Sequence, residues 1–402
     1  MSSKFTFPPV HELPTQDTLP DPFLDLNGQR VQSRADWPAQ RDHLKEMLSH
    51  YMYGQMPSQP DPEQITIKKT FSEIAFDGLG MQEHFTITLT RNGKQTDLDI
   101  ALFRPQETKP YPTIIKNCRI LFDTGADPAL DRMQQTASYD IAAAQEALKR
   151  GYLLCKFARG QLAEDRKGRP ANGVQVLYPE YDWGTIAIWA WGHGVVLDAL
   201  DRMGYVDMEK IVATGHSRGG QTAIAAGIFD ERISVVVPCT GGYGSCGTLR
   251  IRDPEGVRGT EDIIEKYLIP AAAHWHTPRF HEFAGHQNQL PFDAHTLIAL
   301  IAPRPMLNTN ATEDPFNNTL SIEAGIHAGR TVYEWFGHKD RCSLHWRPGA
   351  HAQKEEDWQA LLDFSDKQFF DKKEISTFNQ WVYPDFRPEL SWEASNKRNF
   401  ST

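Results

Sequence analysis

The feature that most constrains this chain is a serine flanked by glycines, Gly-His-Ser217-Arg-Gly, between two segments of different character. Lys210–Thr214 before it has the pattern of a buried β-strand, and Gly219–Phe229 after it has the pattern of a helix. A strand that turns directly into a helix through a serine needs small neighbours, because the turn leaves no room for side chains. The turn also places helix N–H groups beside the hydroxyl. The motif therefore predicts a nucleophilic serine.

The segments around this motif predict the fold class. Three strands with alternating polarity come first, at about 65–71, 84–89 and 96–103, and the Asn92-Gly93 pair predicts a hairpin turn between the last two. Apolar strands then alternate with helices, which is typical of a mostly parallel sheet covered on both faces. We expect a three-layer α/β fold whose mixed sheet begins with antiparallel strands. The later strands are predicted at 112–117, 152–157, 210–214, 234–238, 305–310 and 331–335, and helices at 141–149, 185–203, 219–229 and 356–370.

The domain organisation follows from the same pattern. Residues 1–60 are predicted to be an N-terminal extension and a helix that pack on the body, since the first 32 residues are rich in proline and aperiodic. Leu44, Met47 and Leu48 repeat at helical spacing before Gly54. Residues 61–402 are predicted to form one catalytic domain with an insertion near 240–295.

Composition excludes several classes of function. The chain has 402 residues and a net charge of −10, which disfavours nucleic-acid binding because backbone phosphates attract cations. No stretch approaches the roughly 20 apolar residues of a membrane span, and the N-terminus lacks the apolar region of a secretory signal. We therefore predict a cytoplasmic protein, or a secreted one if a signal was removed. Five scattered cysteines predict free thiols and no zinc site.

A serine nucleophile requires a base and an orienting acid. In a fold of this type they follow the serine in the order acid, histidine, on loops after later strands. Asp314 follows the strand at 305–310, and His351 precedes the terminal helix. We assign Ser217 as nucleophile, His351 as base and Asp314 as acid, with Glu313 as the rival acid and His345 as the rival base.

These residues and their surroundings resemble the glucuronoyl esterases, carbohydrate esterase family 15, over about residues 36–370. The resemblance implies the α/β-hydrolase fold and cleavage of 4-O-methylglucuronic acid esters by a serine triad without metal or cofactor. The shared features are Gly-His-Ser217-Arg218-Gly-Gly, Trp-Gly-Thr-Ile-Ala-Ile-Trp189-Ala-Trp191-Gly, Leu-Pro-Phe292-Asp293-Ala-His295, Ala-Pro303-Arg304-Pro305 and Arg-Pro-Gly-Ala-His351.

The resemblance also implies roles for further residues. Arg218 is carried over to the oxyanion site, and Asn117 stands where the fold takes a second oxyanion N–H. Arg258 and His216 are expected to contact the substrate. Phe316 matches the aromatic residue that stacks on the sugar in many members.

Two departures from the family matter. The segment after the strand that follows the nucleophile, Val-Pro-Cys239-Thr240, has no carboxylate, which favours the later acid, Asp314. The lysine four residues after the serine, which contacts the uronate hydroxyls in the family, is Gln221 here, and its amide can still form hydrogen bonds with the substrate. This loss of charge weakens the case for the same uronate, so the reaction type transfers better than the substrate.

The sequence leaves alternatives to a uronate esterase open. A sugar acetyl esterase or another α/β-hydrolase would use the same triad, and a carbohydrate-binding protein would retain a vestigial site. The expected partner is a small carbohydrate or uronate ester. A group of histidines at 274, 276, 281 and 286 fits no common metal spacing, and Trp183, Trp189 and Trp191 are expected in the core.

Overall fold

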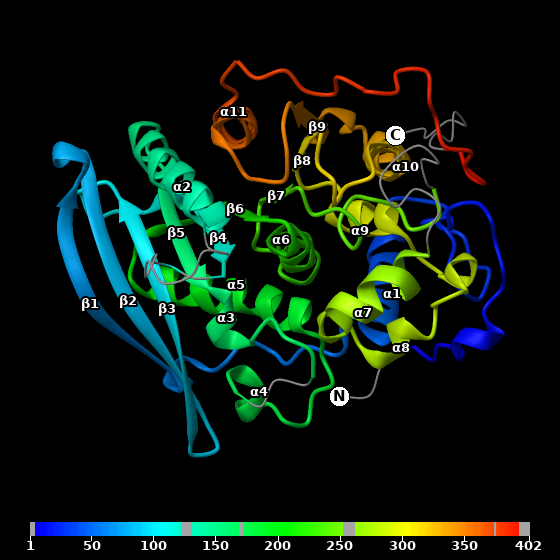
Figure 1. Ribbon diagram of the computed structural model, residues 1–402, viewed down its shortest axis with the longest axis horizontal. Coiled ribbons are helices and arrows are strands. Elements are labelled where there is room, and N and C mark those ends of the chain that lie inside the picture. Colours follow the sequence, from blue (N-terminus) through cyan, green and yellow to red (C-terminus); the bar gives the residue numbers. More distant parts are fainter. Residues whose placement is uncertain are drawn as a thin grey trace.

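A single mixed sheet organises the residues that the computed structural model describes: 5–119, 121, 131–168, 172–251, 262–373 and 375–393 (Figure 1). Its strand order is β1-β2-β3-β5-β4-β6-β7-β8-β9. The pairs β1/β2, β2/β3 and β3/β5 are antiparallel and the remaining pairs are parallel, as predicted. The strands are β1 Ile65–Ala75, β2 Gly80–Arg91, β3 Lys94–Arg104, β4 Tyr111–Cys118, β5 Leu153–Ala158, β6 Val206–His216, β7 Val235–Cys239, β8 Met306–Ala311 and β9 Cys342–Arg347.

Helices cover both faces of this sheet, which gives the three layers. The sheet has one hydrophobic cluster on each face, and alternate residues of each central strand belong to different clusters. In β6, Val212 packs with α2 and α11, whereas Ile211 and Ala213 pack with the helices of the other face. Figure 1 shows α2 and α11 on one side and α5, α6, α9 and α10 on the other. The helices are α1 Trp37–Leu48, α2 Asp131–Lys149, α3 Arg159–Leu162, α4 Val174–Leu177, α5 Thr185–Arg202, α6 Arg218–Phe229, α7 Ile269–Ala272, α8 Pro278–His281, α9 Ala294–Ile301, α10 Thr319–Phe336 and α11 Glu355–Phe370.

Several local predictions are confirmed. Asn92 and Gly93 both have positive φ, 51° and 72°, as a two-residue hairpin turn of type I′ requires between β2 and β3. Trp183, just before α5, and Trp189 and Trp191 within it are buried, and the five cysteines are free. No helix among the described residues is long and apolar enough to cross a membrane. The cytoplasmic location stays a prediction.

The predicted strand at 331–335 is wrong, because these residues form the last turns of α10. The run Thr-Val-Tyr-Glu-Trp has strand propensity, but Ile322, Ile326 and Tyr333 lie on a buried helical face. Gly337 ends the helix in the left-handed conformation, with φ of 77°. The last strand is β9, Cys342–Arg347, so His345 belongs to a strand and the loop that carries His351 begins at Pro348.

The described residues of the N-terminal segment, of the C-terminal segment and of the region predicted as an insertion pack on the body. Phe7, Leu19 and Phe23 of the N-terminal extension are buried in the same core cluster as the sheet. After α11 the chain runs back past β9 to α10, where Trp392 is 6% exposed and donates to Thr331 (Figure 1). The described part of the insertion holds α7, α8 and the short helices Ile264–Leu268, Ala273–Trp275 and Gln287–Gln289.

The contact between α9 and α10 predicts the effect of one substitution. A Cβ on Gly325 of α10 would overlap the carbonyl oxygen of Cys246 and lie 3.4 Å from the Cβ of Ala294. We expect Gly325→Ala to lower the free energy of unfolding by about 1–3 kcal/mol through overpacking, measured by urea denaturation. Helix propensity alone predicts the opposite sign, a gain of about 1 kcal/mol, so a more stable variant would contradict the packing argument.

Candidate active site

The turn at Ser217 has the geometry of a nucleophile elbow. β6 ends at His216 and α6 begins at Arg218, and Ser217 between them has φ of 59° and ψ of −124°. A positive φ is strained for a residue with a side chain, and such strain concentrates at functional sites. A Cβ on Gly215 would lie 2.5 Å from Nδ2 of Asn117, and one on Gly219 would lie 2.7 Å from Oδ1 of Asn117. The glycines are therefore required for the turn to pack against β4.

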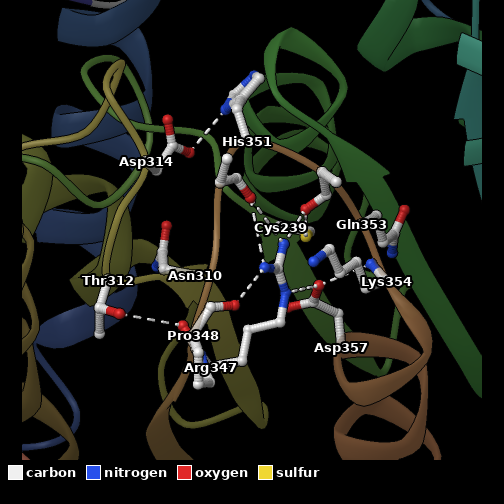
Figure 2. A network of polar contacts seen from close by, with 12 residues as sticks. Cys239, Asn310, Thr312, Asp314, Arg347, Pro348, His351, Gln353, Lys354 and Asp357 are labelled. Carbon is white, nitrogen blue, oxygen red and sulfur yellow. Dashed lines mark hydrogen bonds and ion pairs between the residues drawn. The ribbon is translucent and has the colours of Figure 1, made fainter. Parts of the chain in front are cut away.

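Asp314 and His351 meet on the loops after β8 and β9. Nδ1 of His351 donates to Oδ2 of Asp314 over 2.6 Å (Figure 2). Asp314 is 5% exposed, and it also accepts hydrogen bonds from Nδ2 of Asn317, at 2.8 Å, and from the N–H of Phe316, at 2.8 Å. A carboxylate that accepts from Nδ1 leaves Nε2 as the ring nitrogen that can take a proton. The arrangement is that of the acid–base pair of a triad.

The structure places the rival residues elsewhere. Glu313 is exposed, and its Oε1 accepts from the N–H of Gly349 over 3.3 Å. His345 lies within β9, and its Nδ1 donates to the carbonyl of Thr377 over 3.1 Å. Neither side chain takes part in the hydrogen bond between Asp314 and His351.

A buried arginine holds the loop that carries His351. Arg347, 2% exposed, donates from Nε to Oδ2 of Asp357 over 2.5 Å. Its two terminal nitrogens donate to the carbonyls of Pro348, at 3.0 Å, of Ala350, at 3.3 Å, and of Ala352 (Figure 2). The loop therefore folds around one guanidinium. The sequence motif contained this arginine, but nothing in its spacing indicated that it would turn inward.

Two rings contact His351. His216 lies 4.5 Å away between ring centroids, and burial together with the charge of His351 holds its pKa well below the usual range. Phe316, 43% exposed, presents its ring at 4.9 Å in an edge-on geometry. A neutral His216 adds no charge beside His351, and the exposed Phe316 extends an apolar surface from His351 into solvent.

The predicted oxyanion residues lie at the elbow, with both side chains already engaged. Nδ2 of Asn117 donates to the carbonyls of Gly219, at 2.9 Å, and Thr214, at 3.2 Å, so this amide fastens the elbow to β4. The guanidinium of Arg218 pairs with Asp165 and lies 5.0 Å from the ring of Trp275.

Asp165 is a residue that the sequence reasoning missed. It accepts hydrogen bonds from Nε2 of His274, at 2.9 Å, and from Nε1 of Trp275, at 3.0 Å, in addition to its pair with Arg218. Burial opposes ionisation, but these hydrogen bonds and the charge of Arg218 lower the pKa of Asp165 below its usual range. The carboxylate ties the insertion to the first residue of α6. No sequence spacing links positions 165, 218 and 274.

A cavity of about 540 Å³ borders this network. It lies beyond the carboxyl ends of β4 and β5, and Asp165 shares its lining with Arg119, Arg159 and Trp189. Ligands of open α/β sheets bind at such strand ends. Among the described residues, no group of three His, Cys, Asp or Glu side chains could hold a metal ion.

Of the two remaining predicted substrate residues, the structure describes Gln221 but not Arg258. Gln221 is 6% exposed, and its Nε2 donates to the carbonyls of Gly241, at 3.2 Å, and Tyr243, at 2.8 Å. Its Oε1 has no hydrogen-bond partner within the described part of the chain. Arg258 lies outside the described residues.

Comparison with known proteins gives the family. Residues 87–337 match the family described as "Glucuronyl esterase, fungi". A carbohydrate esterase family 15 glucuronoyl esterase from Caldicellulosiruptor kristjansonii has 31% identity and a TM-score of 0.74, over 92% of this chain and 95% of that chain. The 4-O-methyl-glucuronoyl methylesterase 1 of Wolfiporia cocos is 28% identical over 396 residues, which cover 96% of this chain and 89% of the relative.

A carbohydrate esterase from an unknown prokaryotic organism is 27% identical over 395 residues, covering 87% of this chain and 89% of the relative. The match to the family spans more than half of the 402 residues. The α/β-hydrolase sheet and the elbow agree with it. The chain therefore belongs to the glucuronoyl esterase family and is a carboxylic ester hydrolase.

Proposed function

We propose that this chain hydrolyses esters of glucuronic acid, 4-O-methyl-glucuronoyl esters among them, with Ser217 as nucleophile, His351 as base and Asp314 as acid. The observation that carries the proposal is the 2.6 Å hydrogen bond from His351 to a buried Asp314, on loops beside a strained serine turn. The relative from Wolfiporia cocos bears the name of this activity. The triad residues also stand in the chain order typical of the fold.

In the first step, Nε2 of His351 removes the proton of the Ser217 hydroxyl as Oγ attacks the ester carbonyl. Asp314 accepts the hydrogen bond from Nδ1 and stabilises the imidazolium that forms. The tetrahedral intermediate then collapses: the bond to the alcohol oxygen breaks, and His351 gives its proton to the leaving alcohol. The uronoyl group remains as an ester on Ser217.

In the second step, His351 removes a proton from water, which attacks the acyl-enzyme. The bond to Oγ breaks, the proton returns to Ser217, and a uronic acid is released. In both steps the negative oxygen needs donors that are already in place, and each such donor is worth about 10²–10³ in kcat. We assign the N–H of Arg218 at the start of α6 and an N–H beside Asn117 at the end of β4.

Substrate recognition follows from the groups around His351. Oε1 of Gln221, which has no hydrogen-bond partner among the described residues, can accept from a sugar hydroxyl, and the exposed ring of Phe316 offers a face for stacking. The remaining candidate, His216, contacts His351, with 4.5 Å between the ring centroids. Arg258 would supply a cation for the sugar. With a net charge of −10, the chain needs local cations to attract a uronate.

The nucleophile assignment predicts the behaviour of Ser217→Ala. Because the triad acts as a unit, we expect kcat/KM for methyl glucuronate to fall at least about 10³-fold, with thermal stability unchanged or raised. Turnover of methyl glucuronate, methyl galacturonate and acetyl-xylose should be measured in parallel, with Ser376→Ala as the control serine. A serine-directed phosphonate should label the parent protein but not Ser217→Ala.

Each alternative gives a different result in this experiment. Hydrolysis of acetyl-xylose but not of the uronates would replace the proposed substrate with an acetylated sugar. A folded protein that the phosphonate does not label would contradict an active triad and favour a vestigial binding site.

The loop around Arg347 predicts a selective loss of turnover. Lysine at position 347 keeps a charge for Asp357 but lacks the fork that reaches three carbonyls. We expect Arg347→Lys to lower kcat by about 10–100-fold with little change in KM, because misplacing a base by about 1 Å costs this much. Arg341→Lys, in the short helix Lys339–Arg341 directly before the same strand, is the matched control. Unchanged kcat in a destabilised Arg347→Lys protein would make Arg347 a purely structural residue.

The lowered pKa of Asp165 predicts a pH dependence of stability. A carboxylate with a lowered pKa stabilises the fold above its unfolded pKa of about 3.9, and this contribution is lost as the pH falls below that value. The difference in unfolding free energy between the parent and Asp165→Asn should therefore be constant from about pH 5 to 7 and shrink in acid. A constant difference down to about pH 2 would contradict the lowered pKa.

A further inference from the structure

A second pocket, separate from the site of Ser217, lies between α10 and the C-terminal segment. Its volume is about 280 Å³. His327 and Arg330 come from α10, Lys339 from the turn before β9, and Trp381 and Arg387 from the C-terminal segment. It shares no lining residue with the cavity beside Asp165. The assigned chemistry does not use it.

The walls of this pocket are fixed by buried hydrogen bonds. Glu323 of α10, 0% exposed, accepts from the N–H groups of Val382, at 2.6 Å, and Tyr383, at 3.0 Å. Further along the segment, Nε1 of Trp392 donates to Oγ1 of Thr331 over 3.0 Å. The C-terminal segment is thus fastened to α10 on both sides of Arg387, and the pocket between them is a built feature of the fold.

Two nitrogens of residues that line the pocket have no hydrogen-bond partner in the part of the chain that the structure describes. The rings of Trp381 and His327 stack with centroids 3.9 Å apart, and the guanidinium of Arg330 lies 5.7 Å from the same Trp381 ring. Nε of Arg330 and Nε2 of His327 are buried, and neither has a hydrogen-bond partner among the described residues. A buried polar group without a partner is unfavourable, so an acceptor beside Nε of Arg330 would stabilise this arrangement.

The charges around these nitrogens are mostly positive. Lys339 pairs with Glu334 over 2.6 Å, whereas Arg387 donates from Nη1 to the backbone carbonyl of Pro384, at 3.0 Å, and to that of Phe386. Burial and the charges of Arg387, Arg330 and Lys339 lower the pKa of His327 to about 4. Three cations thus act on one small pocket, with one carboxylate in the lining, in a chain whose net charge is −10.

We propose that this pocket binds a small oxyanion, a phosphate or a carboxylate, carried by a molecule no larger than a monosaccharide. The oxyanion accepts from the guanidinium groups of Arg330 and Arg387, which line the pocket and carry planar sets of donors. The pocket volume, about 280 Å³, is below that of most drug-sized sites, which limits the ligand.

The test is a calorimetric titration of the full chain at low ionic strength with inorganic phosphate, glucuronate and glucose as separate ligands. We expect phosphate or glucuronate to bind, glucose not to bind, and Arg330→Gln/Arg387→Gln to weaken the affinity at least about 10-fold, because hydrogen bonds to charged groups are lost. Lys68→Gln/Lys94→Gln removes the same charge from the exposed β1 and β3 residues and is the matched control.

The outcomes separate the two sources of the anion from failure of the proposal. Binding of phosphate alone identifies a phosphorylated ligand, and binding of glucuronate alone identifies a carboxylated sugar. Glucuronate that binds at the site of Ser217 as a product would bind the double variant equally well, and that result would overturn the proposal. No binding of either anion at about 10 mM would also overturn it.

A milder variant keeps the test valid if the double variant fails to fold. Arg387 is exposed, so Arg387→Gln alone should fold and retain full ester hydrolysis, yet bind the anion about 5-fold more weakly. Arg387→Gln with unchanged anion affinity would contradict the role of this guanidinium.

Discussion

The buried pair between Arg347 and Asp357 is the interaction on which the arrangement of the site depends. A charged guanidinium that is 2% exposed is stable only if its donors are satisfied, and here the partners are one carboxylate and the carbonyls of a single loop. Since that loop joins β9 to α11 and carries His351, satisfying the arginine also determines where the histidine lies. The burial of Arg347 therefore both requires hydrogen-bond partners for the guanidinium and fixes the position of His351.

The elbow applies a comparable constraint from the other side. The turn at Ser217 packs so closely against β4 that the side chain of Asn117 bonds the carbonyls of Thr214 and Gly219. The strained backbone is held by this strand and by the hydrogen bond from its own N–H to the carbonyl of Cys239. Buried polar groups therefore hold the backbone both at Ser217 and in the loop that carries His351, as the proposed triad would require.

The sequence pattern predicted correctly those elements for which local propensity and tertiary packing favour the same structure. The hairpin at Asn92-Gly93, the strand and helix around Ser217 and the buried tryptophans of α5 are examples. The pattern failed at residues 331–335, where strand propensity lost to the helical packing of α10 against α9. It also missed the network at Asp165, since residues 165, 218 and 274 come together only when the insertion folds over the start of α6.

The sequence by itself determined the class of fold, the elbow and the candidate acid and base, because these depend on short-range spacing and on chain order. Only the tertiary structure shows that His351 bonds Asp314 and not Glu313. It also shows that Arg347 is buried against Asp357 and that Arg218 pairs with Asp165. Adjacent carboxylates are equivalent in a sequence. They differ in the fold because one is buried beside the imidazole and the other faces water. Burial, which gives charged contacts their strength, arises only from packing segments that are distant along the chain.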